Sequence, residues 1–398
     1  MTAPLLERLE PQEADKILRL MAQFANDPRP NKVDLGVGVY RTPEGTTPVM
    51  QAVTEAEARL LARQTTKGYV ALEGDPAFHA ALAELVLGQH RPQDRIAALA
   101  TPGGTGAVRH GFELARRANP DVTVWMPDPT WPNHPAITAA MAVPARTYRY
   151  YDASTGGLDR EGMLADLSAV PPGDIVLLHG CCHNPTGADL SAQDWSEIAA
   201  LCITTGAVPM IDLAYLGFGE GPQADVAGIR ILMDAVPEML VAVSGSKSFG
   251  LYRERVGLLL ALCPSAGLRD VVAANMSWLN RLAYAFPPDH GARIVTEVLT
   301  DPALRQIWAD ELDTMRLRID AIRQELAVAL HQQTGTHRFD FLASQKGMFS
   351  LIGATPEQVT RLRDAHALYV VGDGRINLAG LTQSHIPQVA KVLAAELV

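Results

Sequence analysis

The chain alternates between short apolar runs and stretches in which apolar residues recur every three or four positions. The apolar runs predict buried strands at residues 122–126, 174–179, 207–211, 239–243 and 256–262. Helical periodicity predicts helices at residues 55–63, 76–87 and 107–117. Such alternation is typical of an α/β fold in which helices cover a mostly parallel sheet.

A longer helical pattern runs from residue 302 to residue 331. Its apolar stripe consists of Leu312, Met315, Ile319, Ile322 and Leu326. We expect this helix to connect a large domain to a smaller α+β domain at residues 339–398, because 398 residues exceed one ordinary core.

Composition and charge narrow the possible partners. The chain has 34 Lys and Arg against 44 Asp and Glu, a net charge of -10, which argues against nucleic acid and anionic membranes as partners. Its N-terminus lacks the apolar core of a signal peptide, and its longest apolar runs are too short to span a bilayer. None of the four cysteines shows paired metal-ligand spacing, so we expect reduced thiols and a cytoplasmic protein.

The most informative segment, residues 244–257, follows the predicted strand 239–243. A buried strand is not expected to end near a lysine unless the ammonium has a function, because burying an unpaired charge is costly. Lys247 would condense with an aldehyde cofactor, and Ser244, Ser246 and Arg255 would bind the phosphate of that cofactor. For a lone lysine, a solvated loop position is the alternative.

Other strand ends carry further candidates, because ligands of open α/β sheets bind at the carboxyl ends of the strands. A glycine-rich turn at residues 101–108 opens a helix and suits a phosphate, with a hydroxyl from Thr105, although such turns also occur without a ligand. Asp212 either caps a turn or keeps a pyridine nitrogen protonated. Tyr215 and Asn184 would reach an oxygen of the same ring, and Trp131 either packs in the core or stacks on the ring.

Five ordered motifs carry a family resemblance. They are Gly-Gly-Thr-Gly, Thr-Trp-Pro-Asn-His, Cys-His-Asn-Pro-Thr-Gly, Asp-x-Ala-Tyr-x-Gly-Phe and Ser-x-Ser-Lys-x-Phe-Gly-Leu-Tyr-x-Glu-Arg-x-Gly. Over nearly its whole length the chain resembles the class I aminotransferases of pyridoxal-phosphate fold type I, especially the bacterial aromatic-amino-acid (tyrosine) and aspartate enzymes. The resemblance implies a large domain with a mostly parallel seven-stranded sheet and a smaller α+β domain. The expected division is an N-terminal arm at 1–12, a small-domain part at 13–45, the large cofactor domain at 46–312 and the small C-terminal domain at 313–398.

The resemblance also implies roles for individual residues. Lys247 is the lysine that binds pyridoxal 5'-phosphate covalently, Asp212 contacts the pyridine nitrogen, Tyr215 and Asn184 contact the ring hydroxyl, and Trp131 stacks on the ring. The implied phosphate ligands are Gly104, Thr105, Ser244, Ser246 and Arg255, with Tyr69 from the other subunit. Lys247, Asp212 and Tyr215 are the implied catalytic residues, and no metal is expected. Position 103 is Gly where many relatives have Ser, so one phosphate hydroxyl is absent or supplied elsewhere.

Two arginines are expected to bind the substrate. Arg375 matches the family's anchor for the α-carboxylate, which a guanidinium binds through two parallel hydrogen bonds; a surface arginine is the alternative. Arg281 matches the arginine that a neighbouring subunit directs at the distal carboxylate of a dicarboxylate. Gly38 falls on the segment lining the substrate mouth, where Trp131 and Asn184 also contact the substrate. These positions imply a homodimer with shared active sites.

Substrate preference depends on one local difference. Typical aspartate enzymes have Ser-Asn before Pro-Pro, and this chain has Ala285 and Phe286, which replace polar groups with apolar surface; Phe286 alternatively packs in a dimer interface. Arg281 argues for acidic side chains, but this swap and the closer overall resemblance to the bacterial aromatic enzymes together predict an aromatic-amino-acid aminotransferase. It would act on Tyr, Phe and Trp, also on Asp and Glu, with 2-oxoglutarate as acceptor in a ping-pong mechanism. The alternatives are a strict aspartate aminotransferase, another pyridoxal-phosphate reaction such as a decarboxylation, and a regulator without activity.

Overall fold

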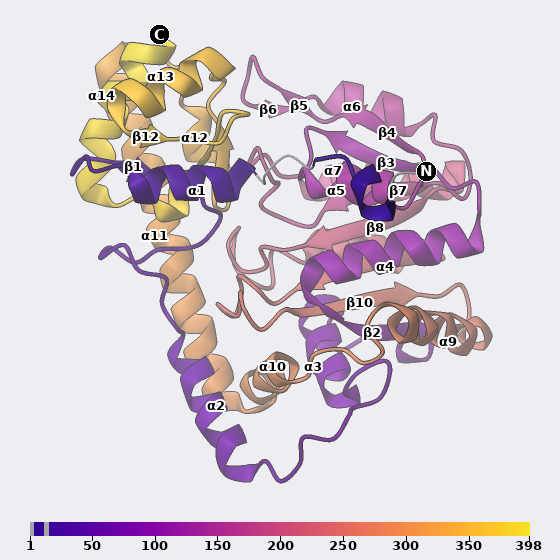
Figure 1. Ribbon diagram of the computed structural model, residues 1–398. Coiled ribbons are helices and arrows are strands. Elements are labelled where there is room, and N and C mark those ends of the chain that lie inside the picture. Colours follow the sequence, from indigo (N-terminus) through magenta and orange to yellow (C-terminus); the bar gives the residue numbers. More distant parts are fainter. Residues whose placement is uncertain (1–3, 12–15) are drawn as a thin grey trace.

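The computed structural model describes residues 4–11 and 16–398, so parts of the predicted arm and of the small-domain segment 13–45 lie outside the described residues (Figure 1). Its main sheet has seven strands in the order β2, β10, β9, β8, β7, β3, β4. Strand β10 is antiparallel to both neighbours, and the remaining neighbours pair in parallel. The predicted fold, an α/β protein with a mostly parallel seven-stranded sheet, is therefore confirmed. The strands are β2 (Ile96–Pro102), β3 (Val124–Asp128), β4 (Ala145–Arg149), β7 (Ile175–His179), β8 (Val208–Leu213), β9 (Met239–Ser244) and β10 (Val256–Leu262).

Helices cover both faces of this sheet. Successive strand residues alternate between two apolar cores, as Leu240 and Val241 do, because side chains of a strand point to opposite faces. One core is closed by α4 (Gly103–Ala118), α5 (Asn133–Ala140) and α9 (Ala266–Ala283). The helices on the other face are α2 (Gln51–Arg63), α3 (Pro76–Leu87), α6 (Arg160–Leu167), α7 (Ala192–Thr205), α8 (Ala227–Ala235) and α10 (His290–Thr300).

A third core packs around the C-terminal part of the long helix α11 (Pro302–Thr334), which is shown in orange in Figure 1. Ile319 of this helix belongs to the large core, and Ile322, one turn further, belongs to the smaller one. The surrounding helices are α1 (Lys16–Asn26), α12 (Phe341–Ser344), α13 (Pro356–His366) and α14 (Ile386–Leu397). Two short sheets pair β1 (Val33–Asp34) with β12 (Leu368–Tyr369) and β11 (Phe349–Leu351) with β13 (Arg375–Asn377). The exact domain boundaries stay a prediction.

Smaller elements complete the chain. A hairpin of β5 (Tyr151–Asp152) and β6 (Gly157–Leu158) projects from the large sheet toward α12, and the 3-10 helices are η1 (Leu5–Arg8), η2 (Gln93–Arg95), η3 (Leu378–Gly380) and η4 (Gln383–His385). Among the described residues, no helix is both long enough and apolar enough to cross a membrane.

Most sequence predictions match these elements within a few residues. Strands β2 and β4 were not predicted, because β2 is rich in alanine and β4 is an edge strand in which only Tyr148 is buried. The loop after β3 is short, since α5 begins already at Asn133.

Gly257 in β10 should be intolerant of any side chain. A β-carbon there would lie 2.3 Å from both the carbonyl carbon and the carbonyl oxygen of Gly103, which are backbone atoms that cannot rotate away. We expect Gly257→Ala to lower the free energy of unfolding by about 1–3 kcal/mol, the usual cost of overpacking. Gly267→Ala in α9 is the matched control, because the nearest atom would be 4.0 Å away. Equal thermal unfolding midpoints for the two variants would contradict this prediction.

Candidate active site

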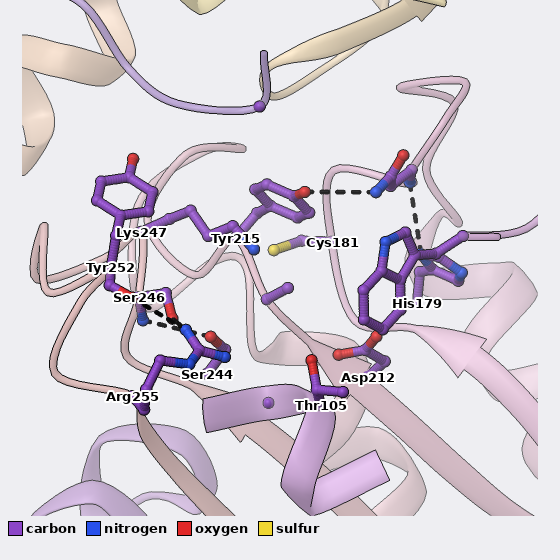
Figure 2. Close-up of a pocket in the computed structure, with 15 residues that line it drawn as sticks. Thr105, His179, Cys181, Asp212, Tyr215, Ser244, Ser246, Lys247, Tyr252 and Arg255 are labelled. Atoms are coloured by element: carbon purple, nitrogen blue, oxygen red, sulfur yellow. Dashed lines mark hydrogen bonds between the residues drawn. The ribbon is translucent and has the colours of Figure 1, made fainter. Parts of the chain in front are cut away.

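A cavity of about 270 Å³ opens at the carboxyl ends of the parallel strands (Figure 2). The structure brings most of the predicted site residues together on its walls, although they come from distant parts of the sequence. The predicted residues that line it are Gly38, Gly104, Thr105, Trp131, Asn184, Asp212, Tyr215, Ser244, Ser246, Lys247 and Arg255. His179, Cys181 and Tyr252, for which no role was predicted, also line the cavity.

One end of the cavity is suited to an anion. The Arg255 guanidinium donates to the Ser246 hydroxyl at 3.2 Å, and Ser244 lies beside them (Figure 2). Helix α4 begins at Gly103 without a side-chain cap, so its first N–H groups and its dipole face the same end. A β-carbon on Gly103 would lie 2.3 Å from Nη2 of Arg255, so the glycine leaves room for the guanidinium. This contact is a physical reason for Gly at a position where many relatives have Ser.

Asp212 lies toward the opposite end of the cavity and is held by a histidine. Oδ2 of Asp212 is 3.0 Å from Nε2 of His134, whose Nδ1 is 2.8 Å from the Thr130 hydroxyl. Burial alone would raise the pKa of Asp212, but the hydrogen bond and the charges of His134, His179 and Lys247 outweigh it, and the pKa is lowered. A carboxylate only accepts, so Nε2 of His134 carries a hydrogen and donates it to Asp212.

The Lys247 amine is buried between these two ends. Its Nζ atom lies 4.7 Å from the centroid of the Tyr215 ring. Burial lowers the pKa of Lys247 to about 8, an effect that Asp212 opposes and that Arg255 and Arg375 reinforce. The neutral amine, which is the state required of a nucleophile or base, is therefore far more accessible near neutral pH than it is for an ordinary lysine.

A chain of polar contacts links the two domains above Lys247. Asn184 donates to the Tyr215 hydroxyl at 3.4 Å, and Arg375 donates to the Asn184 side-chain oxygen at 3.0 Å. Arg375 is only 4% exposed, which excludes a surface position. Its Nε atom has no hydrogen-bond partner among the described residues, and its guanidinium lies 4.4 Å from the Phe349 ring. A buried cation without a carboxylate partner forms a site for an anionic ligand.

Two predicted residues lie away from the cavity of their own chain. Tyr69 is 87% exposed and stacks on Phe286, with ring centroids 4.6 Å apart. Arg281 is exposed in the last turn of α9. The structure of one chain therefore does not bring either residue to Lys247.

Two residues near the cavity, His134 and Phe349, have no role predicted from the sequence. His134 falls within the Thr-Trp-Pro-Asn-His motif, so its position in the motif was a usable signal. Phe349 approaches Gly38, where a β-carbon would lie 3.0 Å from its ring. No local pattern indicates this contact, because the two residues are far apart in the chain.

The lowered pKa of Lys247 has a measurable consequence. In protein stripped of bound small molecules, the rate at which an aldehyde reagent modifies Lys247 should reach half its maximum near pH 8, because only the neutral amine reacts. Asp212→Asn should move this midpoint to lower pH, since the carboxylate raises the pKa of the lysine. Peptide mapping measures both rates, and the exposed Lys391 provides the internal control. A midpoint shared by Lys247 and Lys391 would contradict the prediction.

Comparison with known proteins places this geometry in a family. The family model for aminotransferases of class I and II matches residues 30–393. The chain is 53% identical to the aromatic-amino-acid aminotransferase of Paracoccus denitrificans, covering 98% of this chain and 99% of that protein. It is 40% identical to the aspartate aminotransferase of Salmonella typhi, covering 99% and 100% of the two chains. A crystal structure of the aromatic-amino-acid aminotransferase from Burkholderia pseudomallei, covalently bound to pyridoxal phosphate, superposes with a TM-score of 0.97 at 39% identity and covers all of both chains. The chain belongs to the class I and II aminotransferases.

Proposed function

We propose that this protein is an aromatic-amino-acid aminotransferase that uses pyridoxal 5'-phosphate, accepts Asp and Glu as well, and transfers the amino group to 2-oxoglutarate. The observation that carries the proposal is the buried Lys247 amine, with its lowered pKa, in one cavity with an anion site and Asp212. The 53% identity to the Paracoccus aromatic enzyme supports the substrate class.

The cavity residues fit this cofactor. Arg255, Ser244, Ser246, Thr105 and the start of α4 would hold its phosphate. Gly104 lets the start of α4 approach Ser244 closely, since a β-carbon there would lie only 2.8 Å from Cβ of Ser244. Asp212 would face the pyridine nitrogen, Tyr215 and Asn184 would donate to the ring hydroxyl, and Trp131 would stack on the ring. When bound, pyridoxal phosphate supplies an aldehyde that reacts with amines and a ring that withdraws electrons from the substrate α-carbon.

The protein groups have distinct roles in this scheme. Lys247 would provide the amine for the cofactor's aldehyde, and as a neutral amine it would be the base for the proton on the substrate α-carbon. Asp212 keeps the proton on the pyridine nitrogen, and His134 orients Asp212 through the hydrogen bond described above. Arg375 binds the α-carboxylate, for which its unpartnered Nε and its buried position are suited.

We further propose a cytoplasmic homodimer in which each subunit completes the site of the other. Tyr69 and Arg281 would then contact the partner's cofactor phosphate and the distal carboxylate of the substrate. Apolar side chains of the described part of the N-terminal arm support this proposal, since Leu5, Leu6 and Leu9 are 76%, 74% and 73% exposed.

A strict aspartate aminotransferase is the second candidate, supported by Arg281 and by the relative from Salmonella typhi. An aromatic ring next to Arg281 would leave the charge without a partner, whereas the apolar Phe286 beside Tyr69 favours aromatic side chains. A panel of amino acids with 2-oxoglutarate as acceptor distinguishes the two. Comparable kcat/KM for phenylalanine and aspartate supports the proposal, and turnover of aspartate alone would contradict it.

Lys247→Ala should keep the cofactor site but lose turnover by several orders of magnitude, because no other amine lines the cavity walls described above. Absorbance of bound cofactor and steady-state rates measure the two properties separately. Lys391→Ala, at an exposed position, is the control. Near-normal turnover of Lys247→Ala would refute its role as the base.

Arg281→Ala should reduce kcat/KM for aspartate at least about 100-fold more than for phenylalanine, since a charge-assisted carboxylate contact is worth several kcal/mol. The measurement is kcat/KM for both substrates in one preparation. Losses of equal size would show that Arg281 does not distinguish the side chains.

A further inference from the structure

We propose that His331, His337 and Asp340 form a binding site for a divalent transition metal such as Zn²⁺, separate from the active site. Each residue offers one ligand atom, and these atoms lie within 4.8 Å of one another. Two imidazoles and one carboxylate are ligands that Zn²⁺ and related ions prefer, with the remaining positions open to water.

The end of α11 creates this cluster. His331 lies in the last turn of the helix, which ends at Thr334. Gly335 follows with a φ of +66°, the left-handed conformation that ends many helices and reverses the chain. The reversal brings His337 back over the helix end, so that the His331 and His337 ring centroids are 4.7 Å apart.

A backbone contact prepares His331 for a metal. Its Nδ1 atom lies 2.9 Å from the carbonyl oxygen of Thr336. A carbonyl oxygen only accepts, so Nδ1 carries the hydrogen, and Nε2 of the neutral ring keeps its lone pair. Metal-binding histidines in proteins are commonly oriented by the same kind of hydrogen bond from the second ring nitrogen.

The other two ligands are accessible and already adjacent. Nδ1 of His337 lies 2.6 Å from Oδ2 of Asp340, and their side chains are 82% and 54% exposed. The competing interpretation is a metal-free ion pair between protonated His337 and Asp340.

The surroundings of the cluster connect it to the rest of the fold. The turn borders a cavity of about 760 Å³ between the small domain and the β5–β6 hairpin, which is also lined by Asp128, Asp373 and the oppositely charged Arg338. The next residue after Asp340 is Phe341, whose ring lies so close to the hairpin that a β-carbon on Gly156 would be 2.4 Å from it. A bound metal would therefore fix the turn that leads directly into this contact between the domains.

A second possible cluster, Cys181, Cys182 and Asp225, is less suited to a metal. The Asp225 carboxylate already accepts hydrogen bonds from the backbone N–H groups of Gly217, Gly219 and Glu220. Burial raises the pKa of Cys182 to about 12, which keeps the thiol protonated.

Calorimetric titration of the full-length holoenzyme with Zn²⁺ tests the proposal. We expect one Zn²⁺ per chain, with His331→Gln, His337→Gln and Asp340→Asn each weakening affinity at least about tenfold, since even outer-shell changes commonly cost that much. His90→Gln, at another exposed histidine, should bind Zn²⁺ like the unmodified protein. Unchanged thermal unfolding midpoints without zinc would show that the variants are folded.

Three results would overturn the proposal. In the first, the holoenzyme binds no Zn²⁺, which leaves only the ion pair between His337 and Asp340. In the second, the three variants bind Zn²⁺ as tightly as His90→Gln. In the third, Cys182→Ser abolishes binding and the histidine variants do not change it, which locates the metal at the thiol cluster.

Discussion

The electrostatic balance between the Lys247 amine and the Asp212 carboxylate in one buried cavity is the interaction on which the rest of the site depends. Sheet register sets their separation: Asp212 pairs with His179 of β7 and with Ala242 of β9, and β9 ends at Ser244, three residues before the lysine. Each charge changes the pKa of the other, although the direct contact of Asp212 is with His134, at 3.0 Å, and not with the lysine. His134 and the cationic side chains around the cavity adjust this balance from outside.

Features with strong local patterns were predictable from the sequence. Apolar strands such as β10 and capped helices such as α3 were found with their observed bounds, because burial on both faces or a regular stripe dictates the pattern. Strand β4 was not predicted because an edge strand needs few apolar residues. Strand β2 was not predicted because alanine is compatible with both helices and strands. The fold class was predictable, and the edges of the sheet were not.

The same distinction holds for the site. Residues within continuous motifs, such as Ser244, Ser246 and Arg255, were predicted as a group and lie together. The contact of Arg375 with Asn184 joins positions 191 residues apart, and only the family resemblance suggested that both serve one ligand. Phe349 belongs to none of the sequence motifs, so its contact with Gly38 was not predicted. The roles proposed for Tyr69 and Arg281 require a partner subunit, so the structure of one chain does not test them.

Helix α11 has a mechanical consequence because its successive turns belong to two cores, with Ile319 in one and Ile322 in the other. A continuous helix resists stretching and shear, so α11 is a stiff connection between the two domains. Rotation of the small domain about this shared helix is the motion that such a connection favours. Gly38 and Phe349 would then move together with the small domain, so a small rotation about α11 would open or close the cavity above Lys247.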